Sequence, residues 1–162
     1  MKTLIIGLGN PILTDDGIGV KVAYAVKDRL PLARQDDITV TEASVGGLCL
    51  MEMMVGYDRV ILVDAIQMPG GQPGAIHCLA LDDITSAIPT QHSASTHDMN
   101  LSTALEMGRR LGMALPETIE ILAVEAEDVL TFGETCTPAV AAAIPVATDL
   151  VLQLVSSRAN SK

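Results

Sequence analysis

The chain has 162 residues, of which 49% are hydrophobic and only 2% are aromatic. With no Trp, two Tyr and one Phe, its core must be built from Val, Ile, Leu, Ala and Met. The 10 Lys and Arg face 20 Asp and Glu, a formal net charge of −10 at pH 7. An acidic surface repels phosphate backbones, so we expect no nucleic-acid partner. The length suits one domain, and we predict a single domain over residues 1–162.

Cysteine usage and segment composition bear on the compartment. Cys49, Cys78 and Cys136 show neither a CxxC pair nor zinc-type spacing. We expect buried reduced thiols, which fits a cytoplasmic protein, and the N-terminus shows no signal-peptide pattern. The apolar segment 138–155 carries Asp149 near its centre. A charge there is costly in a bilayer, so we expect a core helix and no membrane insertion.

The first half of the chain alternates strand and helix patterns. Residues 2–9 form a continuous apolar run ending in glycines, as expected of a buried parallel strand. Residues 17–30 carry apolar side chains every four positions and predict a helix. Residues 37–42 alternate as a second strand, and residues 48–55 predict a short Met-rich helix. Residues 59–66, rich in branched aliphatic side chains, predict a third strand that is buried.

The second half continues this alternation. We predict, in order, a strand at 75–81, an irregular loop at 82–96, a helix at 101–111, a strand at 117–124 and a helix at 138–155. Pro145 lies inside the last helix, where we expect a kink. Strands alternating with helices from end to end predict a three-layer α/β/α fold with a mostly parallel central sheet.

The segment GLGNPILTDDGIG, residues 7–19, links the first strand to the first helix. Ligands of such sheets gather beyond the carboxyl ends of the strands. A dinucleotide-binding loop would need G-x-G-x-x-G, but Ile12 takes the third glycine position and two acidic residues would repel a pyrophosphate. Helix capping is the simpler alternative for Asp15 and Asp16, because Asp is favoured at helix N-termini.

Two further residues could join this acidic turn. Asp64 ends an apolar strand pattern, and a buried carboxylate must be hydrogen-bonded, paired or metal-bound. His97 precedes a helical pattern that would fix its direction, whereas His77 lies in mid-strand as a surface or packing residue. Two carboxylates and one imidazole suit nickel, zinc or cadmium better than calcium or magnesium. Spacing alone does not show that Asp16, Asp64 and His97 converge.

Several short segments combine into a more specific pattern. They are Gly9-Asn10, Thr14-Asp15-Asp16-Gly17-Ile18-Gly19, Gly46-Gly47, Val63-Asp64-Ala65-Ile66, Thr96-His97 followed by Leu101, and Thr137-Pro138. In this order and spacing they resemble the peptidases that mature the large subunits of nickel–iron hydrogenases. The resemblance implies an α/β fold of the phosphorylase/hydrolase-like kind. It also implies a metal site formed by Asp16, Asp64 and His97.

The resemblance implies an aspartyl-type endopeptidase that removes a short C-terminal extension from the nickel-loaded precursor of a hydrogenase large subunit. The nickel would belong to the substrate, and zinc or cadmium could replace it in a crystal. Asp16 or Asp64 would serve as general base for attack by water, because no nucleophile motif is visible. Some family members carry Glu in place of Asp16, and the shorter Asp could recruit Asp15 or a water.

Other interpretations stay open. A nickel-binding maturation chaperone that docks on the precursor without cutting would use the same ligands. A structural α/β domain would use the acidic turn only as a helix cap. The opening GLGNP also resembles peptidyl-tRNA hydrolases, but the acidic residues that follow argue against tRNA. The sequence does not fix the oligomeric state, for which a monomer is the default, and we expect the loop 82–96 to help form a substrate-docking surface.

Overall fold

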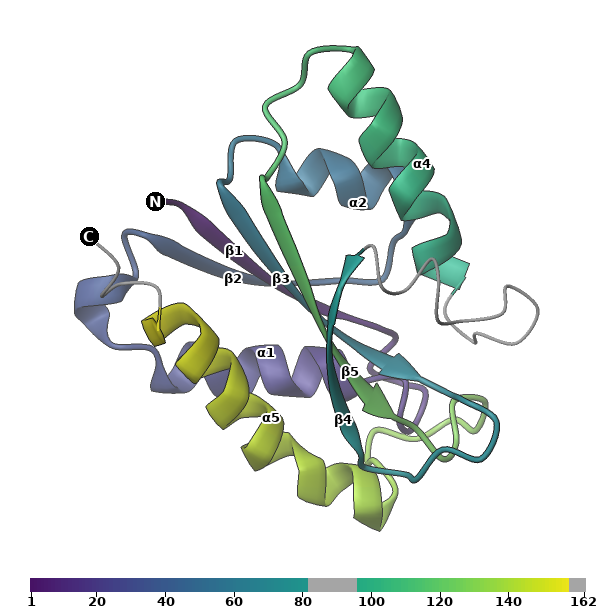
Figure 1. The fold of residues 1–162 in the computed structure, drawn as a ribbon. Helices are drawn as coiled ribbons and strands as arrows, with labels where there is room; N and C mark the ends of the chain where they lie inside the picture. Colours follow the sequence, from purple (N-terminus) through teal and green to yellow (C-terminus); the bar gives the residue numbers. More distant parts are fainter. Residues whose placement is uncertain (82–95, 158–162) are drawn as a thin grey trace.

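A five-stranded, mostly parallel sheet forms the centre of the computed structural model (Figure 1), which describes residues 1–81 and 96–157, without the side chains of 96–100. The strands are β1 (Thr3–Leu8), β2 (Ile38–Ala43), β3 (Arg59–Ile66), β4 (Ile76–Ala80) and β5 (Thr118–Glu125). Their spatial order is β2-β1-β3-β5-β4. β1, β2, β3 and β5 run parallel, and β4 pairs antiparallel with β5 at one edge.

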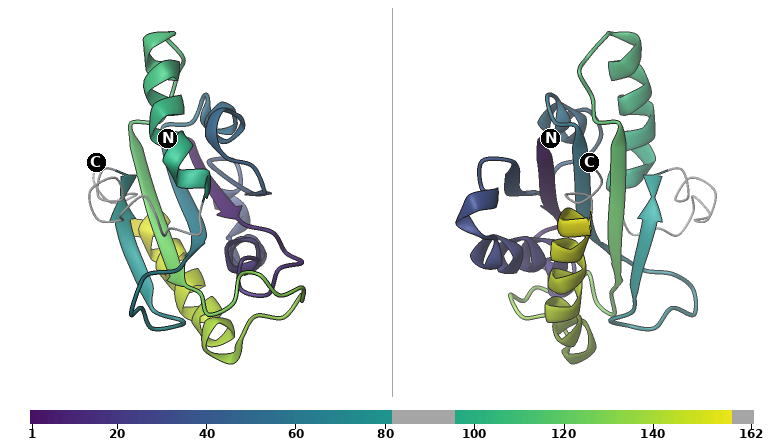
Figure 2. Two further views of the ribbon diagram at one scale, coloured as in Figure 1. Left: turned by 90° about the vertical axis from the view of Figure 1, so that its right-hand side faces the viewer. Right: turned by 60° about the vertical axis from the view of Figure 1, so that its left-hand side comes forward.

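Helices cover both faces of this sheet (Figures 1 and 2). The helices are α1 (Ile18–Arg29), α2 (Gly47–Met54), α4 (Thr96–Arg110) and α5 (Pro138–Ser157), with a short 3-10 turn at Leu32–Arg34. α1 packs with α5 on one face, and α2 packs with α4 on the other. Alternate side chains of β3 enter opposite cores: Ile61 and Val63 face α1 and α5, whereas Leu62 faces α2 and α4. The predicted three-layer fold is therefore confirmed.

The predicted elements are present with small shifts at their ends. β3 matches its predicted range of 59–66, and α4 begins at Thr96, earlier than the predicted 101. α5 continues through Pro145 as one helix, and the expected kink there stays a prediction. By length and composition α5 could cross a membrane, but residues such as Val140, Ala147 and Val151 are buried in the core shared with α1. It is a core helix, as predicted, and the predicted loop 82–96 lies almost wholly outside the described residues.

The prediction of buried thiols is wrong for two of the three cysteines. Cys136 is buried, but Cys49 and Cys78 are exposed. Cys49 lies in α2, where Leu50 and Met51 take the buried positions, and Cys78 lies on the edge strand β4. Cysteine's general preference for the interior does not decide which face of an element a given residue occupies.

One ion pair closes the amino end of the sheet. Arg59, at the start of β3, is only 2% exposed. Its Nε donates to the Glu120 carboxylate of β5 at 2.6 Å, and its Nη1 donates to the Leu154 carbonyl at 2.9 Å. The guanidinium thus ties the end of α5 to two neighbouring strands. Both of its hydrogen bonds go to acceptors that keep its buried charge satisfied.

Candidate functional site

The loop between β1 and α1 folds tightly onto the carboxyl end of the sheet. Gly9 has φ 126°, a conformation that side-chain-bearing residues rarely adopt. A Cβ on Gly9 would overlap the Asp16 carbonyl oxygen, and a Cβ on Gly19 would overlap the carbonyl oxygen of Val63. These glycines therefore let the first turn of α1 press against β1 and β3. The loop holds the two adjacent aspartates at this edge.

Asp15 is a structural residue. Its carboxylate is fully buried and accepts four hydrogen bonds, from the backbone N–H groups of Glu127, Asp128 and Thr137 and from the Thr137 hydroxyl, at 2.7–3.0 Å. It thereby joins the first loop to the segment between β5 and α5. These four hydrogen bonds occupy both oxygens of the carboxylate, which argues against the recruitment of Asp15 as a metal ligand.

Asp16 has a different environment. Its side chain is half-buried, and its Oδ2 accepts the Asn10 N–H at 2.6 Å. Oδ1 accepts no hydrogen bond from the part of the chain that the structure describes. α1 starts after Gly17, without any side-chain capping bond, so the capping interpretation is wrong for both aspartates. Asp16 thus presents a fixed carboxylate with one oxygen available to a ligand.

Asp64 is buried at the carboxyl end of β3, as predicted, with 5% of its surface exposed. Its Oδ1 accepts the Ala65 N–H at 2.9 Å. Alternation along β3 places it on the same face as Leu62 and Ile66, the face covered by α2 and α4. The backbone of His97 lies in the first turn of α4 on that face, but its side chain lies outside the described residues.

The described side chains include no group of three His, Cys, Asp or Glu that could hold a metal ion. Because the imidazole of His97 is not among them, the convergence of Asp16, Asp64 and His97 stays a prediction. What the structure does establish is the position of the two aspartates: the carboxyl ends of adjacent strands β1 and β3, one in the loop and one in the strand.

Sequence reasoning missed Glu125, the last residue of β5. It is 2% exposed, its Oε2 accepts the Met68 N–H at 3.3 Å, and its Oε1 lies 3.5 Å from Nε2 of His77. Its strand neighbour is Ile66, two residues beyond Asp64, so it extends the acidic edge to β5. A signal was present: Val124-Glu125-Ala126 repeats the pattern of Val63-Asp64-Ala65. His77, expected to be a surface or packing residue, is half-buried against this carboxylate.

The Cys136 thiol lies under the first loop, against Thr14. Burial, with a smaller effect from the Asp15 charge, raises the pKa of Cys136, against a lowering effect of Lys21. Its Sγ lies 3.5 Å from the Thr14 carbonyl oxygen, to which it donates. Burial and the Glu120 charge likewise raise the pKa of Cys78. Neither thiol has the lowered pKa of a nucleophilic cysteine.

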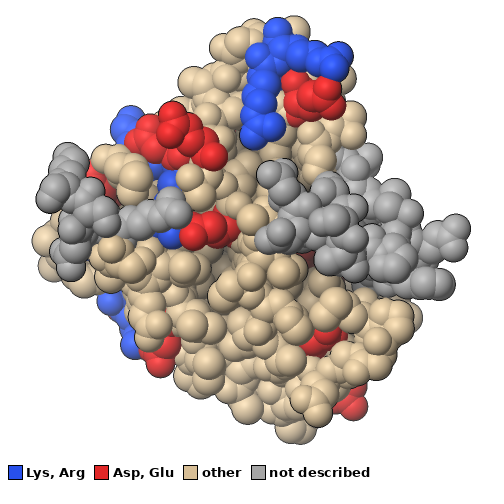
Figure 3. All heavy atoms as spheres, viewed as in Figure 1, with Lys and Arg blue, Asp and Glu red and all other residues tan. Residues whose placement is uncertain are grey.

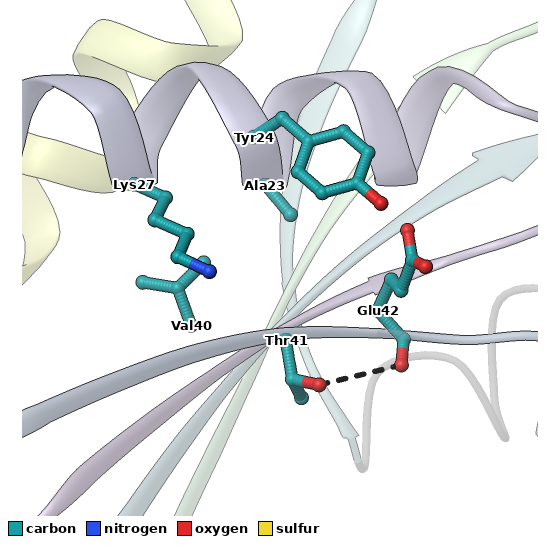
Figure 4. A pocket seen from close by; sticks show the side chains of 6 residues that line it. All are labelled: Ala23, Tyr24, Lys27, Val40, Thr41 and Glu42. Atoms are coloured by element: carbon teal, nitrogen blue, oxygen red, sulfur yellow. Dashed lines mark hydrogen bonds between the residues drawn. The ribbon is translucent and has the colours of Figure 1, made fainter.

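A hollow of about 230 Å³ lies between α1 and β2 (Figure 4). It is lined by Ala23, Tyr24, Lys27, Val40, Thr41 and Glu42. The Tyr24 hydroxyl points toward the Glu42 carboxylate, and hydrogen bonding to that carboxylate is the main cause that raises the pKa of Tyr24. None of the lining residues belongs to the acidic edge, so this hollow is separate from the candidate site.

Fold and site together define a class: an α/β protein with three acidic side chains, Asp16, Asp64 and Glu125, at the carboxyl ends of β1, β3 and β5. Comparison with known proteins then specifies it. A sequence profile of the hydrogenase maturation protease family matches residues 20–154. The chain belongs to this family, and it is a protease.

Individual relatives agree with this assignment. The hydrogenase 2 maturation protease of Escherichia coli K12 is 29% identical over 152 residues, which cover 94% of this chain and 89% of the relative. The solved structure of the hydrogenase maturating endopeptidase HybD from E. coli superposes with a TM-score of 0.81 at 28% identity, over 98% of this chain and 94% of that one. A [NiFe] hydrogenase maturation protease from Thermococcus kodakarensis, 22% identical, shares the fold with a TM-score of 0.71 over 95% and 99% of the two chains.

Proposed function

We propose that the chain cleaves a short C-terminal extension from the nickel-loaded precursor of a hydrogenase large subunit. Membership in the maturation protease family supports the class of substrate. The observation that carries the proposal is the unequal environment of the adjacent aspartates. The Asp15 carboxylate accepts four hydrogen bonds. The Asp16 carboxylate accepts one, from the Asn10 N–H, and its other oxygen is available to a ligand.

In this proposal Asp16, Asp64 and His97 contact the nickel, which arrives as cargo of the substrate and is not a resident cofactor. Carboxylate and imidazole ligands suit such an ion, and zinc or cadmium would occupy the same ligands. Recognition of the metal would restrict cleavage to precursors whose nickel has already been inserted. The precursor's extension would then lie across the carboxyl edge of the sheet.

The bond is broken by water. Asp16 or Asp64 takes a proton from the water as its oxygen attacks the scissile carbonyl carbon, and the proton passes to the departing amide nitrogen. Asp16 is the better base by access, because it is half-buried while Asp64 is 5% exposed. The raised pKa of Cys136 argues against this residue as a thiolate nucleophile.

Mass spectrometry of a precursor, nickel-loaded or nickel-free, after incubation with the protein tests this function. We expect loss of a short C-terminal peptide from the nickel-loaded form only. Asp16→Asn should slow cleavage by roughly 100-fold or more, the scale of a lost general base. Asp28→Asn, the same chemical change at an exposed position of α1, should leave the rate unchanged.

Full activity of Asp16→Asn would remove Asp16 from the mechanism. Cleavage of both precursor forms at equal rates would contradict the role of nickel. A precursor that stays intact but co-purifies with the wild-type chain would favour a docking chaperone over a protease acting on this substrate.

A further inference from the structure

Three large apolar side chains are exposed beside the acidic edge. Ile12 of the first loop is 48% exposed, and Leu130 and Phe132 of the loop between β5 and α5 are 83% and 79% exposed. Phe132 is the only Phe in the chain. A protein with so few aromatic residues would bury this one if folding alone governed its position, because a buried ring contributes more than a buried aliphatic side chain. We call these three residues the loop patch.

Hydrogen bonds and a β-bridge hold together the two loops that carry the loop patch. Thr14 Oγ1 donates to the Thr131 carbonyl at 2.6 Å, the Gly133 N–H donates to the Ile12 carbonyl at 3.0 Å, and Leu13 forms a β-bridge with Phe132. The four hydrogen bonds to the Asp15 carboxylate fix the same two loops to each other. The three apolar side chains are therefore presented together by a hydrogen-bonded pair of loops.

The loop patch is continuous with the candidate site. Ile12 lies two positions from Asn10, whose N–H holds the Asp16 carboxylate, and the Ile12 N–H itself donates to Asn10 Oδ1 at 3.2 Å. A polypeptide that reaches Asp16 must pass beside this loop. Figures 1 and 2 show the loop after β5 and the loop before α1 side by side beyond the carboxyl ends of the strands.

Charge around the patch favours a particular kind of partner. Glu127 and Glu134 of the same loop are exposed. Lys21 of α1 brings one cation to the first loop, with its Nζ near Gly17, and on the face that Figure 3 shows the Lys and Arg side chains lie at the top and left. An apolar centre with an acidic rim complements an apolar surface with basic residues around it. Two copies of this chain would bring two acidic rims together and would also cover the site.

We propose that the loop patch docks the folded body of the hydrogenase large-subunit precursor, on the surface beside the point where its C-terminal extension emerges. This inference rests on the proposed function and adds a second contact to it. The acidic edge recognises the nickel and the scissile bond, whereas the loop patch recognises the protein surface around them. Docking at the loop patch does not require nickel, so the patch contributes equally to the binding of nickel-loaded and nickel-free precursors.

Binding at the loop patch can be measured separately from catalysis with the nickel-free precursor, because we expect this precursor to bind without being cut. Its dissociation constant is measured for the wild-type chain, for Leu130→Ser/Phe132→Ser and for Leu32→Ser. Leu32 is 82% exposed on the 3-10 turn and is a matched control for Leu130. We expect the double variant to bind at least about 10-fold more weakly and the control to bind as the wild type does, as for apolar anchors of protein interfaces. With nickel-loaded precursor, KM should rise similarly while kcat changes less than about 2-fold.

Equal dissociation constants for wild type and double variant would overturn the docking role while leaving the protease function intact. Failure of the wild-type chain to bind nickel-free precursor would overturn it as well. A wild-type dimer that the double variant converts to monomer, with precursor binding unchanged, would assign the patch to a second copy instead. If the wild type binds the precursor but never cleaves it, the proposed function fails. The docking role then stands or falls on the ratio of the dissociation constants of the double variant and the wild type.

Discussion

At the amino end of the sheet the buried charge of Arg59 is paired with Glu120, whereas at the carboxyl end the buried Asp15 carboxylate forms no ion pair with any of the described residues. Asp15 is instead satisfied by backbone N–H groups and one hydroxyl. The difference shows how the two ends divide their tasks. An ion pair satisfies the buried charge at the amino end, while neutral donors at the carboxyl end satisfy Asp15 and leave one oxygen of its neighbour Asp16 without a hydrogen bond from the described residues.

The largest effect should come from removing the backbone-bonded carboxylate. Asp15→Ala eliminates four hydrogen bonds and leaves buried N–H donors unsatisfied, so we expect a loss of about 4 kcal/mol in unfolding free energy. Urea denaturation measures it. Asp16→Ala is the matched neighbour, and with one hydrogen bond at stake it should cost only about 1 kcal/mol. Equal losses of unfolding free energy in the two variants would contradict a structural role that is specific to Asp15.

The amino end should respond less strongly. Arg59→Met keeps the volume but removes the cation, and Glu120, whose side chain is 24% exposed, can recover part of its hydration. We therefore expect a loss of about 2–3 kcal/mol, with unchanged cleavage per folded molecule. Arg29→Met breaks the exposed pair with Asp149 and should cost less than about 1 kcal/mol. A cleavage defect in folded Arg59→Met would show that the two ends are coupled.

The smallest effect is a pH dependence of the turn beneath the loop patch. Hydrogen bonds from Thr131, by its side chain and its backbone, and from the Leu130 N–H lower the pKa of Asp128 from its usual 3.8. A carboxyl whose folded pKa is depressed stabilises the fold fully above its unfolded pKa and loses that contribution as the pH falls through the folded value. The unfolding free energy of the wild type should thus fall slightly more between pH 5 and pH 3 than that of Asp128→Asn. Identical slopes would contradict the assignment.

Much of the fold could be predicted because strands covered on both sides are apolar throughout. β3, buried along its whole length, was located at its observed range from that property. The acidic edge was also accessible, since parallel strands place their ends together. The separate fates of Asp15 and Asp16 were not, because the donors to Asp15 come from residues more than 100 positions away. Helix capping was the simpler local alternative for both residues, and the structure shows tertiary hydrogen bonds to Asp15 in its place.

Glu125 illustrates a different reason for failure. The predicted strand of residues 117–124 ends one residue short of the observed β5, and the sequence pattern assigned no role to the carboxylate that follows. Register with β3 shows that it closes the strand opposite Ile66. Burial of a carboxylate cannot be inferred from a boundary that is one residue short, although the repeated Val-acid-Ala pattern contained the signal.

The bonds of Asp15 to residues 127–137 also set an order of assembly for the newly made chain. The first loop leaves the ribosome early, but its partners follow only after β5 has been synthesised, since they lie more than 100 residues downstream. Until then the loop that carries Asp16 lacks the four hydrogen bonds that join it to the segment after β5. A nascent or truncated chain that ends before residue 127 therefore lacks all four bonds, and we expect it to hold the Asp16 loop less firmly than the full chain does.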